Sequence, residues 1–389
     1  NKKLIKENIN ISRSEFLPSL SISADQTSSQ SFNRRDQTGS SLPDANSDNE
    51  SKSISVDQKI FQGFKGYNSL KKSELESKQA DFKLKQTEQQ TILDTASAYF
   101  DLIFKIKNEK FNLANIDLFE RQVESDNARV QKGEITLTDL AQSESSLAGA
   151  NANLIKAKTE LLASKTNFER VTREKITNTE NLNERIDIEL PKTIKDALEV
   201  TKLNNLDLLI AELDYKIAER ELNIEKSKLS PSASINYSKS ENNDFSSSID
   251  KVDEESVKAT ITWPIIKGGK NISSIKRSSL NRQKTSLLLQ DTKTKVVAET
   301  TNAWSEFQSS ESVLIATEAQ LKAAEIANEG ITLEYDSGNT RTTLDVIQSR
   351  SLLLDARIAY AKAERDFTIS KFALAFQIGS LTLNSIKTL

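Results

Sequence analysis

Two long stretches without proline most limit how this chain can fold. They span Asp44–Leu190 and Ile265–Leu389. Proline and glycine are the residues that most often end helices, so their scarcity permits very long helices. Within Gly66–Gly149 the only internal glycine is Gly133. The sequence therefore predicts one long helix on each side of Gly133.

The apolar residues on either side of this glycine recur at helical spacing. One stripe repeats every seven residues at Ile92, Tyr99, Ile106 and Leu113. A second stripe follows the glycine, at Leu140, Leu147, Leu154, Leu161 and Phe168. Two such helices that meet at one glycine are typical of an antiparallel coiled-coil hairpin. At 1.5 Å per residue, an arm of about 65 residues would extend roughly 100 Å.

The second half of the chain repeats the pattern of the first. Gly63 and Gly133 match Gly268 and Gly338 at the same offset of 205 positions. The second return arm again carries apolar residues every seven positions, at Val346, Leu353, Tyr360, Phe367 and Leu374. A shared offset at several separate points indicates a duplication.

The duplication predicts two structural repeats, residues 1–185 and 186–389. Each repeat is expected to contain one long helical hairpin. The first hairpin is predicted over about residues 66–176 and the second over about residues 270–382, turning at Gly133 and Gly338.

Four segments alternate apolar with small polar residues, which is the period of a strand. They cover about residues 17–26, 53–62, 232–239 and 256–264. Polar residues fill the connections 26–52 and 240–255. We expect the first to be an exposed loop or disordered and the second to be a polar loop. Strands of about ten residues can cross an outer membrane at a tilt. A small soluble β-sandwich inserted in a coiled coil explains the alternation equally well.

A membrane sheet built from these strands would need more than one chain. An open sheet edge in lipid leaves backbone groups without hydrogen bonds, so the sheet must close. About eight strands are the practical minimum for a closed barrel. Four strands per chain therefore have to be pooled between chains, and three chains would supply twelve.

The composition argues against an enzyme. The 389 residues contain no histidine and no cysteine, so the commonest general base, thiol nucleophile and zinc ligands are missing. The formal net charge is only −3, with both signs of charge interspersed, which argues against a nucleic-acid partner. We therefore expect no catalytic residues, no cofactor and no metal site.

Several motifs resemble those of one family, the TolC-like outer-membrane factors. Asp57–Gly63 and its partner Trp263–Gly269 resemble the strand-to-helix turn of these proteins. Tyr335–Gly338 followed by Arg341–Val346 resembles the second helix turn, and Leu17–Leu20 resembles the entry to the first strand. The resemblance covers nearly the whole chain and includes the duplication.

The resemblance implies a fold that is mainly α-helical with a β-barrel part. Duplicated helical hairpins would form an α-helical barrel, and a homotrimer would share a twelve-stranded transmembrane β-barrel. It implies a passive exit duct in the outer membrane of a Gram-negative bacterium, extending into the periplasm. The expected partners are outer-membrane lipid, a periplasmic adaptor and an inner-membrane transporter, for type I protein secretion or multidrug efflux. The alternative is a soluble coiled-coil scaffold with a small β insertion.

The family resemblance also implies a periplasmic gate beside the two helix turns. The matching positions are Asp139, Tyr335, Arg341 and Asp345. One extra residue lies between Gly338 and Asp345, so this turn departs from the family pattern. The simpler alternative is that Asp139 and Asp345 begin the return helices, where the helix dipole favours negative charge.

Overall fold

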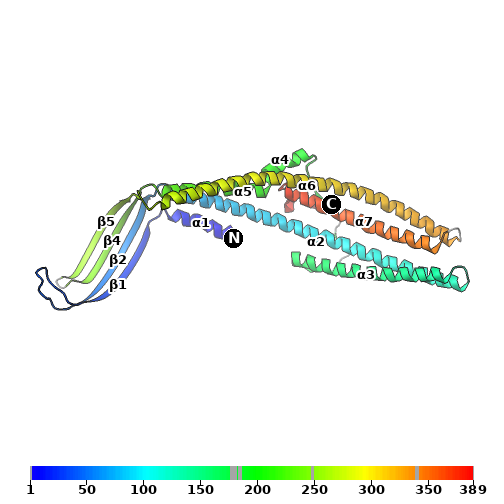
Figure 1. Cartoon of the computed structure of the whole chain (residues 1–389), viewed down its shortest axis with the longest axis horizontal. Helices are drawn as coiled ribbons and strands as arrows, with labels where there is room; N and C mark the ends of the chain where they lie inside the picture. Colours follow the sequence, from blue (N-terminus) through cyan, green and yellow to red (C-terminus); the bar gives the residue numbers. More distant parts are fainter. Residues whose placement is uncertain (1, 176–181, 183–185, 247–248, 338–340, 389) are drawn as a thin grey trace. The chain divides into compact units, whose positions relative to one another are not determined.

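The computed structural model describes residues 2–175, 182, 186–246, 249–337 and 341–388 (Figure 1). Its helices are α1 (Lys2–Ser14), α2 (Lys65–Gln131), α3 (Leu137–Thr172), α4 (Ile194–Asn204), α5 (Leu206–Ser227), α6 (Lys270–Asp336), α7 (Thr343–Gln377) and the 3-10 helix η1 (Leu383–Ser385). Its strands are β1 (Ser19–Ser31), β2 (Ala45–Phe61), β3 (Ile186–Ile188), β4 (Ser232–Ser246), β5 (Ile249–Thr262) and β6 (Ile386–Thr388). None of the described helices is long and apolar enough to cross a membrane.

The chain forms two compact units. The first combines Asn1–Leu84 with Leu209–Asp291, and the second combines Lys85–Leu208 with Thr292–Leu389. Both units therefore draw on both halves of the chain, and the long helices α2 and α6 each contribute to both.

The first unit contains a four-stranded antiparallel sheet with the order β1-β2-β4-β5 (Figure 1). The central pair, β2 and β4, joins the strands of the two predicted repeats. Because every neighbouring pair is antiparallel, side chains that face each other across the strands share one face of the sheet. The strands β1 and β5 are the two edges of this sheet.

One face of the sheet is lined by hydroxyl groups. The Ser21 and Ser55 hydroxyls share a hydrogen bond of 2.7 Å, and those of Ser238 and Ser256 share one of 2.9 Å. The opposite face carries apolar residues that are largely exposed, including Ile22 at 75% and Val257 at 73%. The alternation read from the sequence thus separates a polar face from an apolar face.

The strands are longer than the sequence predicted. The first was expected to end near residue 26, but β1 runs to Ser31 and pairs with β2 from Ala45 onward. Likewise β4 and β5 continue through most of the predicted loop 240–255. The prediction was wrong here because it followed apolar alternation. The hydrogen bonds of a strand ladder join backbone groups, so polar segments such as Gln26–Ser31 extend it without apolar side chains.

In the second unit, α2 packs against α3 and α7, and α7 also packs against α6 and approaches α3. Leu102, Leu161 and Phe168 pack α2 against α3. Phe100 of α2 packs on Phe372 of α7, with ring centroids 6.0 Å apart. On the other side of α7, a buried cluster of Ala197, Trp304, Leu374 and Ile378 holds α6 and α4. The predicted return arms, with their apolar heptads, are thus the helices α3 and α7.

Two smaller features complete this part of the fold. The helix α4 begins at Ile194 after the N-cap Thr193, and Asn205 separates it from α5. The Asn205 side chain accepts a hydrogen bond from the backbone N–H of Leu208 and donates one to the Gln377 carbonyl, so it caps α5 instead of continuing α4. Shortly before Pro191, β3 pairs with β6.

A matched pair of glycines tests how tightly α4 and α5 are held. Gly379 and Gly133 both have φ +75°, but a Cβ at Gly379 would collide with the backbone of Asn204, whereas one at Gly133 would meet open space. Gly133→Ala should cost only the left-handed conformation, about 1–2 kcal/mol. Gly379→Ala should lower the melting temperature by far more, because the α4–α5 connection must shift. Thermal unfolding followed by circular dichroism would contradict this if both variants melted alike.

Candidate functional site

The turn between α2 and α3 is set by one glycine and one capping residue. Gly133 takes a left-handed conformation, and the following Glu134 N–H donates to the Arg129 carbonyl at 2.9 Å, which ends α2. Thr136 then caps α3. The corresponding Gly338, predicted as the tip of the second hairpin, lies outside the described residues.

The two predicted acidic gate residues are part of helix caps. Asp139 accepts hydrogen bonds from the backbone N–H and hydroxyl of Thr136, at 2.9 and 2.7 Å. Asp345 makes the same two bonds to Thr342, at 2.8 and 2.9 Å. These hydrogen bonds hold the pKa of each carboxyl below its ordinary value. Within one chain, the geometry is that of the capping box, as the simpler alternative expected.

Arg341 is bound to its own hairpin. Its Nε donates to Glu334 Oε2 at 2.6 Å, and both side chains are about half exposed. The hydrogen bond to Glu334 raises the pKa of Arg341, and the positive charge of Arg341 helps to lower the pKa of Asp345. The structure therefore brings Arg341 and Asp345 together electrostatically, but it does not pair Arg341 with Asp139.

Tyr335 is the one predicted gate residue that is buried, at 5% exposed. Its hydroxyl donates to Asp126 Oδ1 at 2.9 Å and lies 3.1 Å from Thr343 Oγ1. The Arg129 guanidinium lies over its ring, 4.6 Å from the centroid. Burial, followed by the hydrogen bond to Asp126, raises the pKa of the Tyr335 hydroxyl, so this group stays protonated and can donate.

Asp126 is the centre of this arrangement and was missed at the sequence level. It is fully buried. Besides the bond from Tyr335, it accepts one from Ser143 Oγ at 2.5 Å and one from Gln122 Nε2 at 2.9 Å. These contacts join α2, α3 and α6, and Tyr335 adds α7 through Thr343. We call Gln122, Asp126, Ser143, Tyr335 and Thr343 the Asp126 cluster.

A signal for Asp126 was present in the sequence. Apolar residues at Ile116, Phe119, Val123 and Val130 follow the three-and-four spacing of a core stripe, and Asp126 occupies the missing position of that stripe. A carboxylate at a core position is costly unless it is hydrogen-bonded, so it calls for partners from neighbouring helices.

A positive charge also faces the cluster. Arg350 donates to the Leu118 carbonyl at 3.0 Å, which ties α7 to α2. Burial lowers the pKa of Arg350, and the charge of Asp336, then Asp126, opposes that shift. Arg350 therefore adds a positive charge near the buried side chain of Asp126, which is held by hydrogen bonds.

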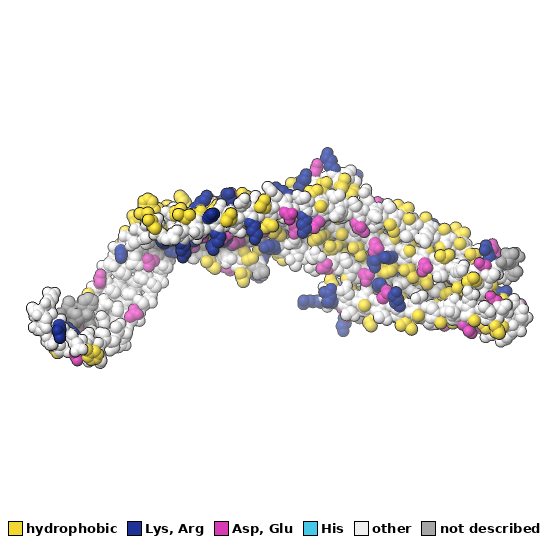
Figure 2. Space-filling view, in the orientation of Figure 1, with side chains coloured by type: hydrophobic (Ala, Val, Ile, Leu, Met, Phe, Trp, Pro, Cys, Tyr) yellow, Lys and Arg dark blue, Asp and Glu magenta, His cyan; other side chains and the backbone are white. Residues whose placement is uncertain are grey.

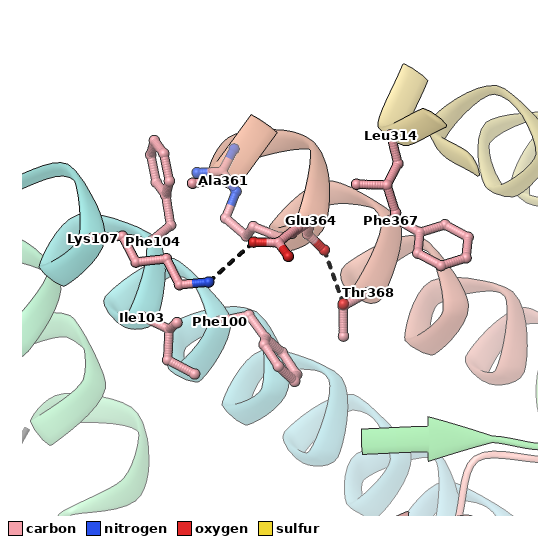
Figure 3. A pocket seen from close by; sticks show the side chains of 10 residues that line it. Phe100, Ile103, Phe104, Lys107, Leu314, Ala361, Glu364, Phe367 and Thr368 are labelled. Carbon is pink, nitrogen blue, oxygen red and sulfur yellow. Dashed lines mark hydrogen bonds and ion pairs between the residues drawn. The ribbon is translucent and has the colours of Figure 1, made fainter. Parts of the chain in front are cut away.

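A pocket of about 440 Å³ lies farther along the same helices, between α2, α6 and α7 (Figure 3). Its apolar wall includes Phe100, Phe104 and Phe367. Its charged groups are already engaged, since Lys107 bonds Glu364 at 3.0 Å and Arg365 bonds Asp101 at 3.0 Å. These two ion pairs bridge α2 and α7 beside the pocket. Among the described residues, no group of acidic side chains is arranged to hold a metal ion.

Acid should loosen the capped turns. The pKa of Asp139 is lower in the folded protein than in the unfolded chain. Its contribution to the stability of the capped turn is therefore fully present above the unfolded pKa, about 4. That stability is lost as the pH falls through the lower folded pKa. Hydrogen exchange followed by mass spectrometry, corrected for intrinsic rates, should show the first turn of α3 losing protection between pH 5 and pH 2.5. Asp139→Asn is the control, and an unchanged pH dependence in that variant would contradict this cause.

Comparisons with known proteins agree with this architecture. The sequence model described as "Outer membrane efflux protein" matches residues 3–172 and 197–380. The outer membrane protein TolC of Salmonella enteritidis is 26% identical over 386 residues, covering 96% of this chain and 77% of that protein. The outer membrane efflux protein BepC of Brucella suis biovar 1 (strain 1330) is 23% identical over 337 residues, covering 86% and 73%.

Solved structures share the fold. The outer membrane protein VceC of Vibrio cholerae has a TM-score of 0.82 at 18% identity, covering 97% of this chain and 90% of that chain. The CmeC outer membrane channel of Campylobacter jejuni has a TM-score of 0.84 at 16% identity, covering 97% and 81%.

Proposed function

Because this chain belongs to the outer membrane efflux protein family, we propose that three copies form a passive duct through which substrates leave the cell. The protein is an outer-membrane protein of a Gram-negative bacterium. Its fold is mainly helical, with an α-helical barrel part and a β-barrel part. The observation that carries the proposal concerns the sheet and the packed helices. The outermost described strands and helices of each expose surfaces that a neighbouring copy could cover.

In the helical unit, the two edge helices carry exposed apolar stripes. Ile155 and Leu162 lie seven residues apart on α3 and are 67% and 66% exposed. On α6, Ile315, Ile326 and Leu333 are each more than 60% exposed. These stripes lie away from the buried faces that pack on α2 and α7. A head-to-tail contact, in which α3 of one copy meets α6 of the next, would cover both stripes and generate a ring.

The sheet leads to the same conclusion independently. Among the strands that the structure describes, its edges β1 and β5 each have a neighbour on one side only, which leaves a row of backbone groups without a strand partner. Pairing β1 of one copy with β5 of the next would satisfy them, as a bilayer requires. Three copies supply twelve strands, and the number three rests on the resemblance to TolC-like factors.

The two faces of the sheet fit lipid on one side and water on the other. The apolar face, with Ile22 and Val257, would meet lipid. The opposite face, with its paired serine hydroxyls, would line a water-filled lumen. Figure 2 shows few hydrophobic side chains over the strands and a group of them where the strands end and the helices begin. The segments 26–52 and 240–255 would face the cell exterior.

We further propose that the Asp126 cluster closes the periplasmic end. It joins both hairpins close to their turns, so the helices cannot separate there while its hydrogen bonds remain. Asp139, Arg341 and Asp345 are exposed beside the same turns, where a neighbouring copy could exchange partners with them. Arg341 can do so by leaving Glu334, because an exposed ion pair contributes only about 0–1 kcal/mol.

The expected partners are a periplasmic adaptor and an inner-membrane transporter, which would open the closed end and deliver a protein or a small molecule. The duct itself would carry out no catalysis. The two repeats, residues 1–185 and 186–389, would each supply one strand pair and one hairpin to the ring. The soluble scaffold that the periodicity left open does not fit a member of an outer-membrane family.

Mass measurement and bilayer recording test the proposal. The protein purified in detergent should have the mass of three chains of 43.4 kDa, and it should form ion-conducting channels in planar bilayers. A monomer that does not conduct would overturn the shared barrel.

A further inference from the structure

The apolar face of the sheet is crossed by rungs of paired residues, and one rung is apolar or aromatic throughout. Leu20 faces Val56, Val56 faces Tyr237, and Tyr237 faces Val257. Nearer to the helices, Ile235 faces Ala259 on the same side. This rung therefore lies within the apolar band of the sheet.

The same face becomes charged within two rungs, in the direction of the β1–β2 connection. Ile54 faces Lys239, which faces Glu255, and on the next rung Lys52 faces Glu241, which faces Asp253. We call Lys52, Lys239, Glu241, Lys251, Asp253 and Glu255 the charged belt.

Ion pairs run along the charged belt. Lys52 bonds Glu50 at 2.8 Å and Lys251 bonds Glu241 at 2.5 Å. Their side chains are 44–58% exposed, so the charges stand at the surface of the lipid-facing side. The charged belt is therefore a band of mixed charge that ends abruptly on the side nearer to the helices, where the apolar band begins.

The apolar band between the charged belt and the helices is short. On β5 the apolar residues Val257, Ala259 and Ile261 lie between Glu255 and Trp263, which follows the strand. At about 3.3 Å per residue and a barrel tilt of about 40°, Glu255 and Trp263 are separated by roughly 20 Å along the membrane normal. The apolar band of a typical outer-membrane barrel is about 25 Å tall.

We propose that the outward face of this sheet fits a bilayer with a thin hydrocarbon core of roughly 20 Å, with the charged belt among the head groups of the outer leaflet. Charged side chains on the lipid face are strongly destabilising near the bilayer midplane and are tolerated near its interfaces. Trp263, 64% exposed, marks the other interface, where aromatic residues are enriched. The inference rests on the proposed transmembrane barrel.

Spin labels on single cysteines can locate the boundary, because the chain contains no natural cysteine. Labels would be attached to Val257→Cys and Asp253→Cys, which share the outward face of β5. Lys258→Cys is the matched control, since its neighbour in the register, Asn236, bonds Asp57 on the hydroxyl-lined face. The full-length protein would be reconstituted in phosphatidylcholine vesicles. Label accessibility to oxygen and to a water-soluble nickel chelate would then be measured by electron paramagnetic resonance.

The ratio of oxygen to nickel accessibility should be several-fold higher at position 257 than at position 253, with position 258 resembling position 253. If positions 253 and 257 were equally immersed in lipid, the apolar band would extend through the charged belt and the thin-core inference would be overturned. If position 257 were as accessible to nickel as position 258, the outward face would not meet lipid at all. That result would overturn the proposed barrel itself, so the two failures are distinguishable.

Discussion

The double variant Asp126→Asn, Tyr335→Phe should conduct ions much better than the parent channel. Tyr335 is the only hydroxyl that α6 contributes to Asp126 in the Asp126 cluster, and the carboxylate also accepts from Ser143 of α3. A hydrogen bond to a charged group contributes about 1.5–3 kcal/mol. A loss of about 2 kcal/mol per chain would shift each closed–open equilibrium roughly thirtyfold. Single-channel recording in planar bilayers would show a larger conductance or more frequent opening.

Two matched substitutions serve as controls for this experiment. Asp355→Asn removes a carboxylate from an exposed position of α7, and Tyr67→Phe removes a hydroxyl from a tyrosine that is 49% exposed. Neither should change the conductance. The melting temperature of each trimer would be recorded as well, so that an unfolded variant is recognised. A properly assembled double variant with the conductance of the parent would show that the Asp126 cluster does not close the channel.

Charging the exposed edge of α3 should prevent assembly. In the proposed ring, Ile155 and Leu162 are covered by α6 of the neighbouring copy. The double variant Ile155→Asp, Leu162→Asp would place two unpaired carboxylates in each of three contacts. Leaving a buried charge unpaired costs about 3–5 kcal/mol, which exceeds what an interface of moderate size tolerates. Native mass spectrometry in detergent should show single chains in place of trimers.

Asn167→Asp is the matched control for the edge of α3. It adds one negative charge to the same helix, at an exposed position whose side chain accepts a hydrogen bond from Arg170. It lies on neither the α2-facing stripe nor the stripe of Ile155 and Leu162, so the trimer should persist. If the Ile155→Asp, Leu162→Asp variant also remained trimeric, α3 would not form the contact between copies.

Much of the fold could be predicted because its signals are local. Helix breakers and heptad spacing depend on neighbours along the chain, so α2, α3, α6 and α7 lie close to where the proline-free stretches placed them. The family resemblance extended the prediction to the outer membrane. Strand lengths were predicted less well, because the ladder between β1 and β2 continues through polar residues that carry no apolar alternation.

The candidate site was only partly predictable. Tyr335 was identified from the resemblance at the second turn, and the structure buries it at the junction of the two hairpins. Asp139 and Asp345 were identified too, and in a single chain they cap the return helices α3 and α7. Arg341 was identified as a gate residue too, and in a single chain its guanidinium binds Glu334 of its own hairpin.

The sequence by itself determined where the four long helices form, that four strands accompany them, and which face of each strand is apolar near the helices. Only the tertiary structure identified Asp126 as a buried residue that joins the two hairpins close to their turns. Its partners Tyr335 and Ser143 come from α6 and α3, far away in the sequence. The rotation of four packed helices decides which polar side chains meet in a buried space. No periodicity along one helix encodes that rotation, because it depends on how the side chains of all four helices fill the space between them.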